Sequence, residues 1–248
     1  MIRIAVINES TAIADGQIRA WMPAFQRQWS KDLAPIWMVD DAGFTFLHKD
    51  KPPARGTWWV VFLDDSDQAD ALAYHDLTNE GFPLSKVFVK TLQADKASIS
   101  VGATHEICEM AVDPWLNSAY QDKHGVFWAG EICDPVEDDQ YGYNIKIGST
   151  TTLVTDFVTP NWFAHEHSGS QMDFRRRASR PFQIMAGGYA QKFDPKKGWV
   201  EVSGRAPSTS RAAHTMDGTR HERRMRLQGK AGKRSRRKFG RASMVTPP

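Results

Sequence analysis

Cysteine is scarce in this chain, and long apolar runs are missing. The 248 residues include only two cysteines, Cys108 and Cys133. Two cysteines cannot build a disulfide framework, so an oxidising compartment is not implied. The longest strongly apolar run, Trp58 to Leu63, is far too short to cross a bilayer. The first residues, MIRIAVINES, lack a basic segment followed by a long apolar stretch, so we expect no secretion signal and no membrane partner.

Residues 1–203 also lack an excess of basic side chains, whereas residues 204–248 are rich in them. Residues 204–248 hold 13 Lys and Arg against 2 Asp and Glu, a net charge of +11. The whole chain holds 32 basic and 29 acidic residues, which leaves 19 basic and 27 acidic residues, a net charge of −8, for residues 1–203. We therefore predict a folded domain over residues 1–203 and a basic arm over residues 204–248 that does not fold alone.

Hydrophobic patterning within residues 1–203 predicts several short strands and two helices. A helix is expected from Asp15 to about Lys31, with Pro23 as a site for a kink, and a second helix from Ser98 to Val112. A bend is expected at Gly187-Gly188. This composition of elements predicts an α+β fold with a mixed sheet on one or two helices. The expected extended segments are residues 2–7, 44–48, 58–63, 72–75, 86–92, 151–160 and 181–202.

The segment Thr104 to Met110, THEICEM, carries the clearest chemical signal. Residues four apart on a helix share one face, so His105 and Glu109 would present an imidazole and a carboxylate side by side. Glu106 would point about 100° away, at the edge of the same cleft. Metallopeptidase helices use this arrangement, with two ligands one turn apart and a glutamate that acts on the metal-activated water. The usual motif has histidine at both ligand positions, and here Glu109 replaces the second.

A third ligand has to come from another part of the chain. Glu131, 26 residues after His105, is the best candidate. Asp134 is expected either to hold the other imidazole nitrogen or to be a ligand itself. Asp113 is a weaker option, because the helix ends there. One histidine with two carboxylates is a harder donor set than a histidine-rich one, so the expected cofactor is zinc or another divalent metal, or none.

Two other interpretations of these residues stay open. Glu106 and Glu109 are compatible with ordinary solvated charges, and His105 with a partly buried structural histidine. In a sulfur-based alternative, His105, Cys108 and Cys133 converge on a structural zinc ion. Isolated cysteines, however, usually pack as small core hydrophobes.

Several segments together resemble a family of uncharacterised, zincin-like (metallopeptidase-fold) proteins of bacteria and tailed bacteriophages, with HExxE in place of HExxH. The resemblance covers residues 1–203 and is strongest at VDPWLN and EICDPVE. It implies a twisted sheet, an edge strand over the cleft at residues 86–92, and the HE helix beneath. The segments that carry it are Tyr74-His75, KVFVK, THEICEMAVDPWLN, GEICDPVEDD, TDFVTPNWF and PFQIMAGGY.

The same resemblance implies roles for individual residues. His105 and Glu109 match the metal-ligand positions, Glu106 the general base and Glu131 the downstream acidic ligand. An active site of this kind would catalyse metal-assisted hydrolysis of an extended peptide that adds to the edge strand. The candidate oxyanion stabilisers are Tyr74, His75 and Tyr143, for each of which packing is the commoner role.

The basic arm is dense in Lys and Arg, and its dense part has one aromatic residue, Phe239. This composition favours contact with a phosphate backbone over base stacking. A solubilising tail, or docking on an acidic protein surface, is the alternative. The candidate polyanion-binding residues are Arg220, Arg223, Arg224, Arg226, Lys230, Lys233, Arg234, Arg236, Arg237, Lys238 and Arg241.

The resemblance and the arm together predict a bacteriophage virion structural protein, such as a capsid, neck or tail component. The metallopeptidase-like domain would be degenerate. The arm would anchor the protein among other virion proteins, or on packaged nucleic acid, in particles assembled in the host cytoplasm. Two alternative functions are an active metal-dependent peptidase that uses Glu106 as general base, and a nucleic-acid-associated protein that acts through the arm.

We predict that a chain ending at residue 203 loses the affinity of the full chain for duplex DNA. Each phosphate contact releases counterions, so the affinity of the full chain should fall by orders of magnitude between about 50 and about 200 mM salt. Fluorescence anisotropy with a labelled duplex measures both effects. Affinity that is insensitive to salt, or equal in the two chains, would contradict a polyanion-binding arm.

Overall fold

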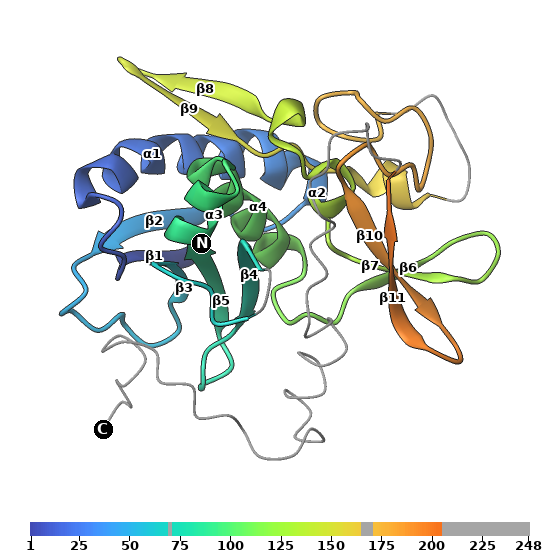
Figure 1. Cartoon of the computed structure of the whole chain (residues 1–248), viewed down its shortest axis with the longest axis horizontal. Coiled ribbons are helices and arrows are strands. Elements are labelled where there is room, and N and C mark those ends of the chain that lie inside the picture. The colour runs from blue at the N-terminus through green and yellow to red at the C-terminus, as the bar shows by residue number, and fades with distance from the viewer. Residues whose placement is uncertain (69–70, 165–170, 205–248) are drawn as a thin grey trace.

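The computed structural model describes residues 1–68, 71–164 and 171–204 of the chain. The predicted α+β class is confirmed by a five-stranded mixed sheet, a four-stranded antiparallel sheet and a two-stranded hairpin, packed with helices (Figure 1). The predicted basic arm lies outside the described residues beyond Gly204. None of the helices in the described ranges is long and apolar enough to cross a membrane.

The five-stranded sheet has the order β2-β1-β3-β5-β4. The pairs β1–β2, β1–β3 and β3–β5 are parallel, whereas β4 runs antiparallel to β5 at one edge. A turn in which the Thr78 N–H donates to the Phe82 carbonyl joins β4 to β5. The strands are β1 (Ile2–Asn8), β2 (Ala42–Leu47), β3 (Trp58–Leu63), β4 (Ala73–Leu77) and β5 (Pro83–Phe88).

The prediction that residues 86–92 form the edge strand is wrong. Residues 86–88 end β5, which lies inside the sheet between β3 and β4, and α3 (Val89–Ala94) follows at once. The edge strand is β4, because the hairpin turn folds it back along the outer side of β5. Sequence patterning located both segments but contained no information on which of them lies outside.

The side chains of the inner strands alternate between two buried faces of the sheet, which explains the nearly continuous apolar sequence of these strands. In β1, Ile4 and Val6 belong to the main core, whereas Ala5 and Ile7 pack in a smaller cluster on the opposite face. Successive side chains of a strand point to opposite faces, so a strand buried on both faces needs an unbroken apolar run.

The first helix is longer than predicted. It comprises α1 (Asp15–Arg27), a π-helical segment (Gln28–Leu33) and α2 (Ala34–Trp37), and it ends where Met38 adopts a φ of 53°. Pro23 lies inside α1. The predicted apolar stripe is confirmed: three members are fully buried and two pack partly buried against the core, namely Ile18, Phe25 and Trp29, and Trp21 and Met22.

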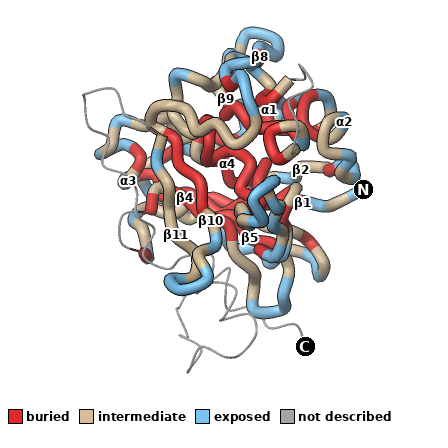
Figure 2. The backbone as a smooth tube through the Cα atoms, turned by 90° about the vertical axis from the view of Figure 1, so that its right-hand side faces the viewer, coloured by how far each residue is buried: buried red, intermediate tan, exposed pale blue. Residues whose placement is uncertain are grey.

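The second predicted helix is confirmed as α4 (Ile99–Val112), which runs through the centre of the molecule (Figure 2). The Ser98 side chain accepts a hydrogen bond from the Val101 N–H at its start, and Asp113 follows its last residue. Eleven of its 14 residues are buried. These include His105, Glu106 and Glu109. Such side chains are unusual in a buried helix unless they are paired or bind a metal.

The remaining strands form two smaller layers. The hairpin of β8 (Tyr143–Ile147) and β9 (Thr150–Val154) packs on α1 (Figure 1). The antiparallel sheet has the order β11-β10-β7-β6. Its strands are β6 (Ala119–Gln121), β7 (Phe127–Ala129), β10 (Tyr189–Asp194) and β11 (Gly198–Ser203), and short 3-10 turns lie at Asp134–Val136, Asp139–Tyr141 and Pro160–Phe163.

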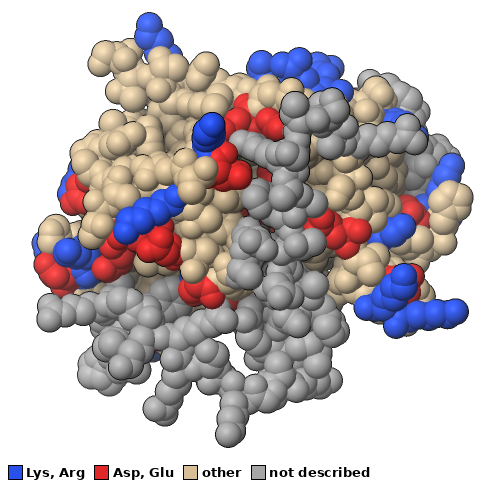
Figure 3. All heavy atoms as spheres, viewed as in Figure 1, with Lys and Arg blue, Asp and Glu red and all other residues tan. Residues whose placement is uncertain are grey.

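Charged side chains of both signs lie on the face of the molecule that Figure 3 shows. On the face in Figure 3, lysine and arginine side chains stand in small groups among acidic ones. This mixed surface agrees with the modest net charge of residues 1–203 and leaves residues 204–248 as the concentrated basic segment.

A buried pair of carboxyl groups follows β9. Asp156 accepts hydrogen bonds through Oδ1 from the backbone N–H groups of Phe157 at 2.8 Å and Arg175 at 3.1 Å. Burial, together with the neighbouring Asp173 carboxylate, raises the pKa of Asp156 to about 9. The raised pKa keeps Asp156 protonated at neutral pH beside Asp173, which accepts hydrogen bonds from the backbone N–H groups of Arg177 and Ala178.

This pair predicts a pH dependence of stability. The unfolded chain releases the Asp156 proton near pH 3.8, whereas the folded chain holds it to about pH 9. Because the folded state binds more protons across this window, the contribution of Asp156 to stability falls as the pH rises from about 4 to about 9. Asp156→Asn keeps a hydrogen-bond donor that does not titrate. Urea unfolding at about pH 5 and about pH 8 should show a smaller loss of unfolding free energy in the variant. Equal losses in both proteins would contradict this assignment.

Candidate metal centre

Six ionisable side chains meet beside α4, where β4 and the loop after β7 approach it. Two are imidazoles and four are carboxylates, and none is more than 7% exposed. They come from three parts of the chain that are distant in sequence. We call this set the buried cluster: His75 from β4, His105, Glu106 and Glu109 from α4, and Glu131 and Asp134 from the loop.

Strand register aims His75 at the helix. His75 pairs with Ser85 across β4 and β5, and the Ser85 hydroxyl donates to the Glu106 carbonyl at 3.3 Å. Side chains that are paired across two strands share one face of the sheet. Tyr74, the neighbour of His75, is paired with Lys86 and therefore points to the opposite face.

Backbone hydrogen bonds hold the loop against α4. The Cys133 N–H donates to Glu109 Oε1 at 3.1 Å, and the Val158 N–H donates to the Ile132 carbonyl at 2.7 Å. Gly188 lets the chain pass closely behind the loop, because a Cβ there would lie 2.7 Å from the carbonyl oxygen of Asp134. Gly187, with a φ of 83°, confirms the predicted bend. These contacts present Glu131 and Asp134 to the helix.

The first half of the cluster is centred on one nitrogen of His105. Its Nε2 lies 3.2 Å from Asp134 Oδ1 and 3.3 Å from Glu109 Oε1. Ligand atoms around a tetrahedral ion with bonds of about 2.1 Å are about 3.4 Å apart, whereas N–H···O hydrogen bonds are most often about 2.9 Å long. The contact between His105 and Asp134 is a long hydrogen bond, and the separations of both oxygens from Nε2 also fit atoms that share an ion. His105, Glu109 and Asp134 form a group that can hold a metal ion.

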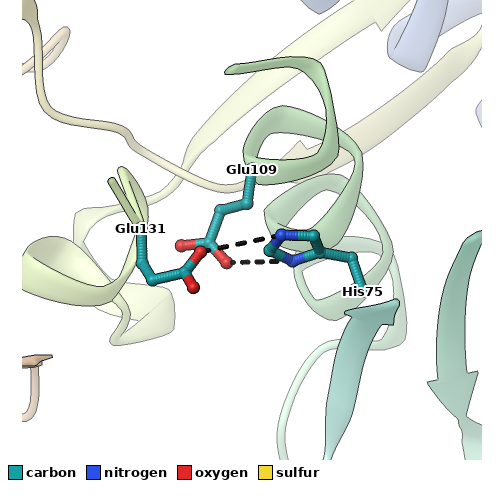
Figure 4. Close-up of side chains that lie close together, drawn as sticks. All are labelled: His75, Glu109 and Glu131. Carbon is teal, nitrogen blue, oxygen red and sulfur yellow. Dashed lines mark ion pairs between the residues drawn. The ribbon is translucent and has the colours of Figure 1, made fainter. Parts of the chain in front are cut away.

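The second half surrounds His75. Its Nδ1 lies 3.3 Å from Glu106 Oε2 and 3.7 Å from Glu109 Oε2, and its Nε2 lies 3.7 Å from Glu131 Oε2. Figure 4 shows the carboxylates of Glu109 and Glu131 turned toward the ring of His75 from the helix and the loop. His75, Glu109 and Glu131 are a second group that can hold a metal ion.

Burial and like charge shift the pKa values of the cluster. Burial by itself lowers the pKa of His75, but the carboxylates of Glu131, Glu106 and Glu109 outweigh it and raise the pKa to about 9. Glu109, chiefly through burial and then through Asp134, has its pKa raised to about 8. Burial also opposes the charge on His105, yet Glu109 and Asp134 raise its pKa well above the ordinary value. A cation that binds these groups would therefore displace protons from them.

The structure places the predicted ligands in two groups. His105 and Glu109 lie together as predicted, but Glu131 lies beside His75, and Asp134 takes the place beside His105. Asp134 was predicted as either a partner or a ligand of the histidine, and its Oδ1 lies beside the same nitrogen that Glu109 faces. Glu106 contacts His75 at the edge of the cluster.

Other predicted site residues lie elsewhere. Asp113 belongs to neither group that can hold an ion in the described ranges, and its Oδ1 accepts the backbone N–H groups of Asn117 and Ser118 at 2.8 and 3.0 Å. Tyr143 is not an oxyanion stabiliser at this cluster, because its hydroxyl donates to Asp32 at 2.8 Å. Tyr74 is also turned away, and its hydroxyl donates to Asp67 at 2.6 Å.

The sulfur-based alternative is wrong within the described residues. Cys108 and Cys133 are both buried in the main core, and their side chains contact each other. Neither belongs to a group that can hold an ion in the described ranges. Cys108 packs in the main core with Ile107, Met110 and Ala111 of the same helix.

His75 was predicted only as an oxyanion stabiliser, and Tyr189 was not predicted at all. A pocket reaches His105 and Glu106, and its lining includes Ala73 at the start of β4, Gly102 of α4 and Tyr189 of β10. Burial, and then the charge of Asp134, raises the pKa of Tyr189 well above its ordinary value, so its phenol remains a hydrogen-bond donor. No spacing signal connects either residue to His105, because both arrive through tertiary contacts.

Comparison with models of protein families, with curated proteins and with solved structures found no match for this chain. The site is therefore interpreted from its own geometry. The predicted polyanion-binding residues, from Arg220 to Arg241, lie outside the described residues.

We predict that Asp134→Asn weakens divalent metal binding at the His105 group at least about tenfold, because the amide removes one anionic ligand. Asp113→Asn is the matched control. It neutralises another buried aspartate near α4 and keeps the oxygen that accepts hydrogen bonds from Asn117 and Ser118. Competition for Zn²⁺ with a chromophoric chelator measures the affinity. Equal affinities of the wild type and both variants would contradict the site.

Proposed function

We propose that this chain is a zincin-like, metal-dependent peptidase whose catalytic groups lie on α4. One observation carries the proposal. Asp134 Oδ1 and Glu109 Oε1 lie 3.2 and 3.3 Å from His105 Nε2, so three potential ligand atoms are close together. Glu106 lines the same pocket as His105. Asp134 supplies the ligand that the HExxE pattern by itself leaves open.

The arrangement of the sheet supports this proposal. The sheet ends in one antiparallel edge strand, β4, and α4 packs directly against β4 and β5. The resemblance implies an edge strand above the HE helix, and the position of β4 beside α4 is compatible with it. The edge strand is β4 rather than the segment first expected.

Each residue of the site then has a chemical role. A divalent ion held by His105, Glu109 and Asp134 would polarise a carbonyl group and lower the pKa of a water molecule. Glu106 would accept the proton from that water and pass it to the leaving amine. His75 Nδ1, 3.3 Å from Glu106 Oε2, orients the carboxylate. Tyr189, which lines the same pocket, would provide a phenol donor for developing negative charge.

An extended peptide is the substrate class that fits the pocket. Ala71, Leu72 and Ala73 line it where the chain enters β4, so the pocket runs along the start of the edge strand to His105 and Glu106. A sheet edge offers backbone N–H and C=O groups to an added strand. A peptide paired there would carry its backbone past the general base.

The virion role predicted from the sequence stays a prediction. It rests on the resemblance and on residues 204–248, whose structure beyond Gly204 is not described. It is compatible with peptidase activity, because an arm that anchors the domain in a particle would confine cleavage to nearby proteins. The nucleic-acid-associated role rests on the same residues and also stays a prediction.

We predict that Glu106→Gln lowers peptide hydrolysis at least about 100-fold, because the amide cannot accept a proton. The same variant should retain metal, because Glu106 is outside the His105 group. Glu137→Gln is the matched control, since Glu137 lines the same pocket but belongs to neither ion-holding group.

Hydrolysis is measured with a mixture of internally quenched peptides on metal-loaded full-length chain, and the metal content is measured by elemental mass spectrometry. Activity in Glu106→Gln equal to that of the Glu137→Gln control would rule out Glu106 as general base. A metal-loaded wild type that cleaves none of the peptides would overturn the peptidase proposal.

A further inference from the structure

We propose that the buried cluster binds two divalent metal ions, with the carboxylate of Glu109 as the bridge between them. One ion is held by His105, Glu109 and Asp134, and the second by His75, Glu109 and Glu131. This inference rests on the proposed metal site at His105 and does not depend on peptide hydrolysis.

The orientation of Glu109 supports a bridge. Its Oε1 lies 3.3 Å from His105 Nε2, whereas its Oε2 lies 3.7 Å from His75 Nδ1. Each oxygen of one carboxylate therefore faces a different imidazole. Paired ions in two-metal hydrolytic sites are about 3.5–4 Å apart, a separation that one carboxylate can span. A carboxylate that served only the first ion would not need a histidine beside its second oxygen.

The second site has its own ligands on independent elements. His75 comes from the edge strand and Glu131 from the loop, and Glu131 Oε2 lies 3.7 Å from His75 Nε2 (Figure 4). Glu109 Oε2 approaches the same ring from the Nδ1 side, at 3.7 Å. One ligand atom from each of the three residues lies within 4.8 Å of the others.

Charge balance favours two ions over one. The cluster contains four carboxylates, and histidines that bind metal are neutral. One divalent ion would leave a net charge of −2 among side chains that are at most 7% exposed. Uncompensated buried charge is strongly unfavourable, and a second divalent ion brings the sum to zero. The competing arrangement is a single ion, with His75 as a cation in place of the second.

Manganese tests this directly, because it suits mixed imidazole and carboxylate ligands and is paramagnetic. Metal-free full-length chain is saturated with Mn²⁺ and freed of excess ion by gel filtration, and the metal is counted by elemental mass spectrometry. We expect about two Mn²⁺ per chain and the electron paramagnetic resonance signal of a coupled pair.

Two variants on different elements remove the second site only. His75→Gln and Glu131→Gln should each bind about one Mn²⁺ per chain and give the six-line signal of an isolated ion. Glu137→Gln, which neutralises a nearby carboxylate outside both groups, should keep the pair. Urea unfolding identifies any variant that has not folded, and the remaining variant then decides the result.

One Mn²⁺ per chain in the wild type would overturn the inference, and so would a coupled pair that persists in both variants. These failures are distinguishable from failure of the proposed function. A single ion that is lost in Asp134→Asn, in a chain that cleaves peptides, would leave the peptidase proposal intact and remove only the second site. Absence of any bound ion would overturn both.

Discussion

The Glu109 carboxylate lies between the imidazoles of His75 and His105, and the arrangement of the rest of the buried cluster depends on this contact. A carboxylate buried on a core helix is strongly unfavourable unless cations or donors surround it. His105 faces one of its oxygens, His75 faces the other, and the Cys133 N–H donates to it as well. These partners belong to α4, β4 and the loop after β7, so compensating one charge requires all three elements to be in place.

The excess of carboxylates over imidazoles distinguishes this cluster from an ordinary buried ion pair. A structural pair needs equal numbers of opposite charges at hydrogen-bond distances. Here four carboxylates face two histidines, and the closest N···O distances are 3.2–3.3 Å. The contacts of His75 with Glu106 and of His105 with Asp134 are long hydrogen bonds, and the same separations also fit ligands around an ion. The carboxylates of Glu131, Glu106 and Glu109 raise the pKa of His75 against the effect of burial, whereas burial, and then the charge of Asp134, raises the pKa of Glu109.

Local patterns in the sequence were sufficient to predict an individual helix or strand. The helix over Ser98 to Val112 was predicted because its apolar run ends at an Asp-Pro pair, and β3 because six bulky apolar residues are adjacent. The edge strand could not be predicted, because residues 72–75 and 86–92 both have extended patterns and only the hairpin decides which is outside. The third ligand was uncertain for a related reason, since Glu131 and Asp134 lie three residues apart on one loop.

By itself, the sequence determined α4, the placement of His105 and Glu109 one turn apart with Glu106 beside them, and the separation of acidic and basic charge along the chain. These follow from composition and from a helical repeat that acts over four residues. Only the tertiary structure decided that His75 faces Glu109, that Asp134 rather than Glu131 joins His105, and that Tyr189 lines the pocket. Those contacts depend on strand register and on the path of a loop, which bring together residues about 30 or more positions apart.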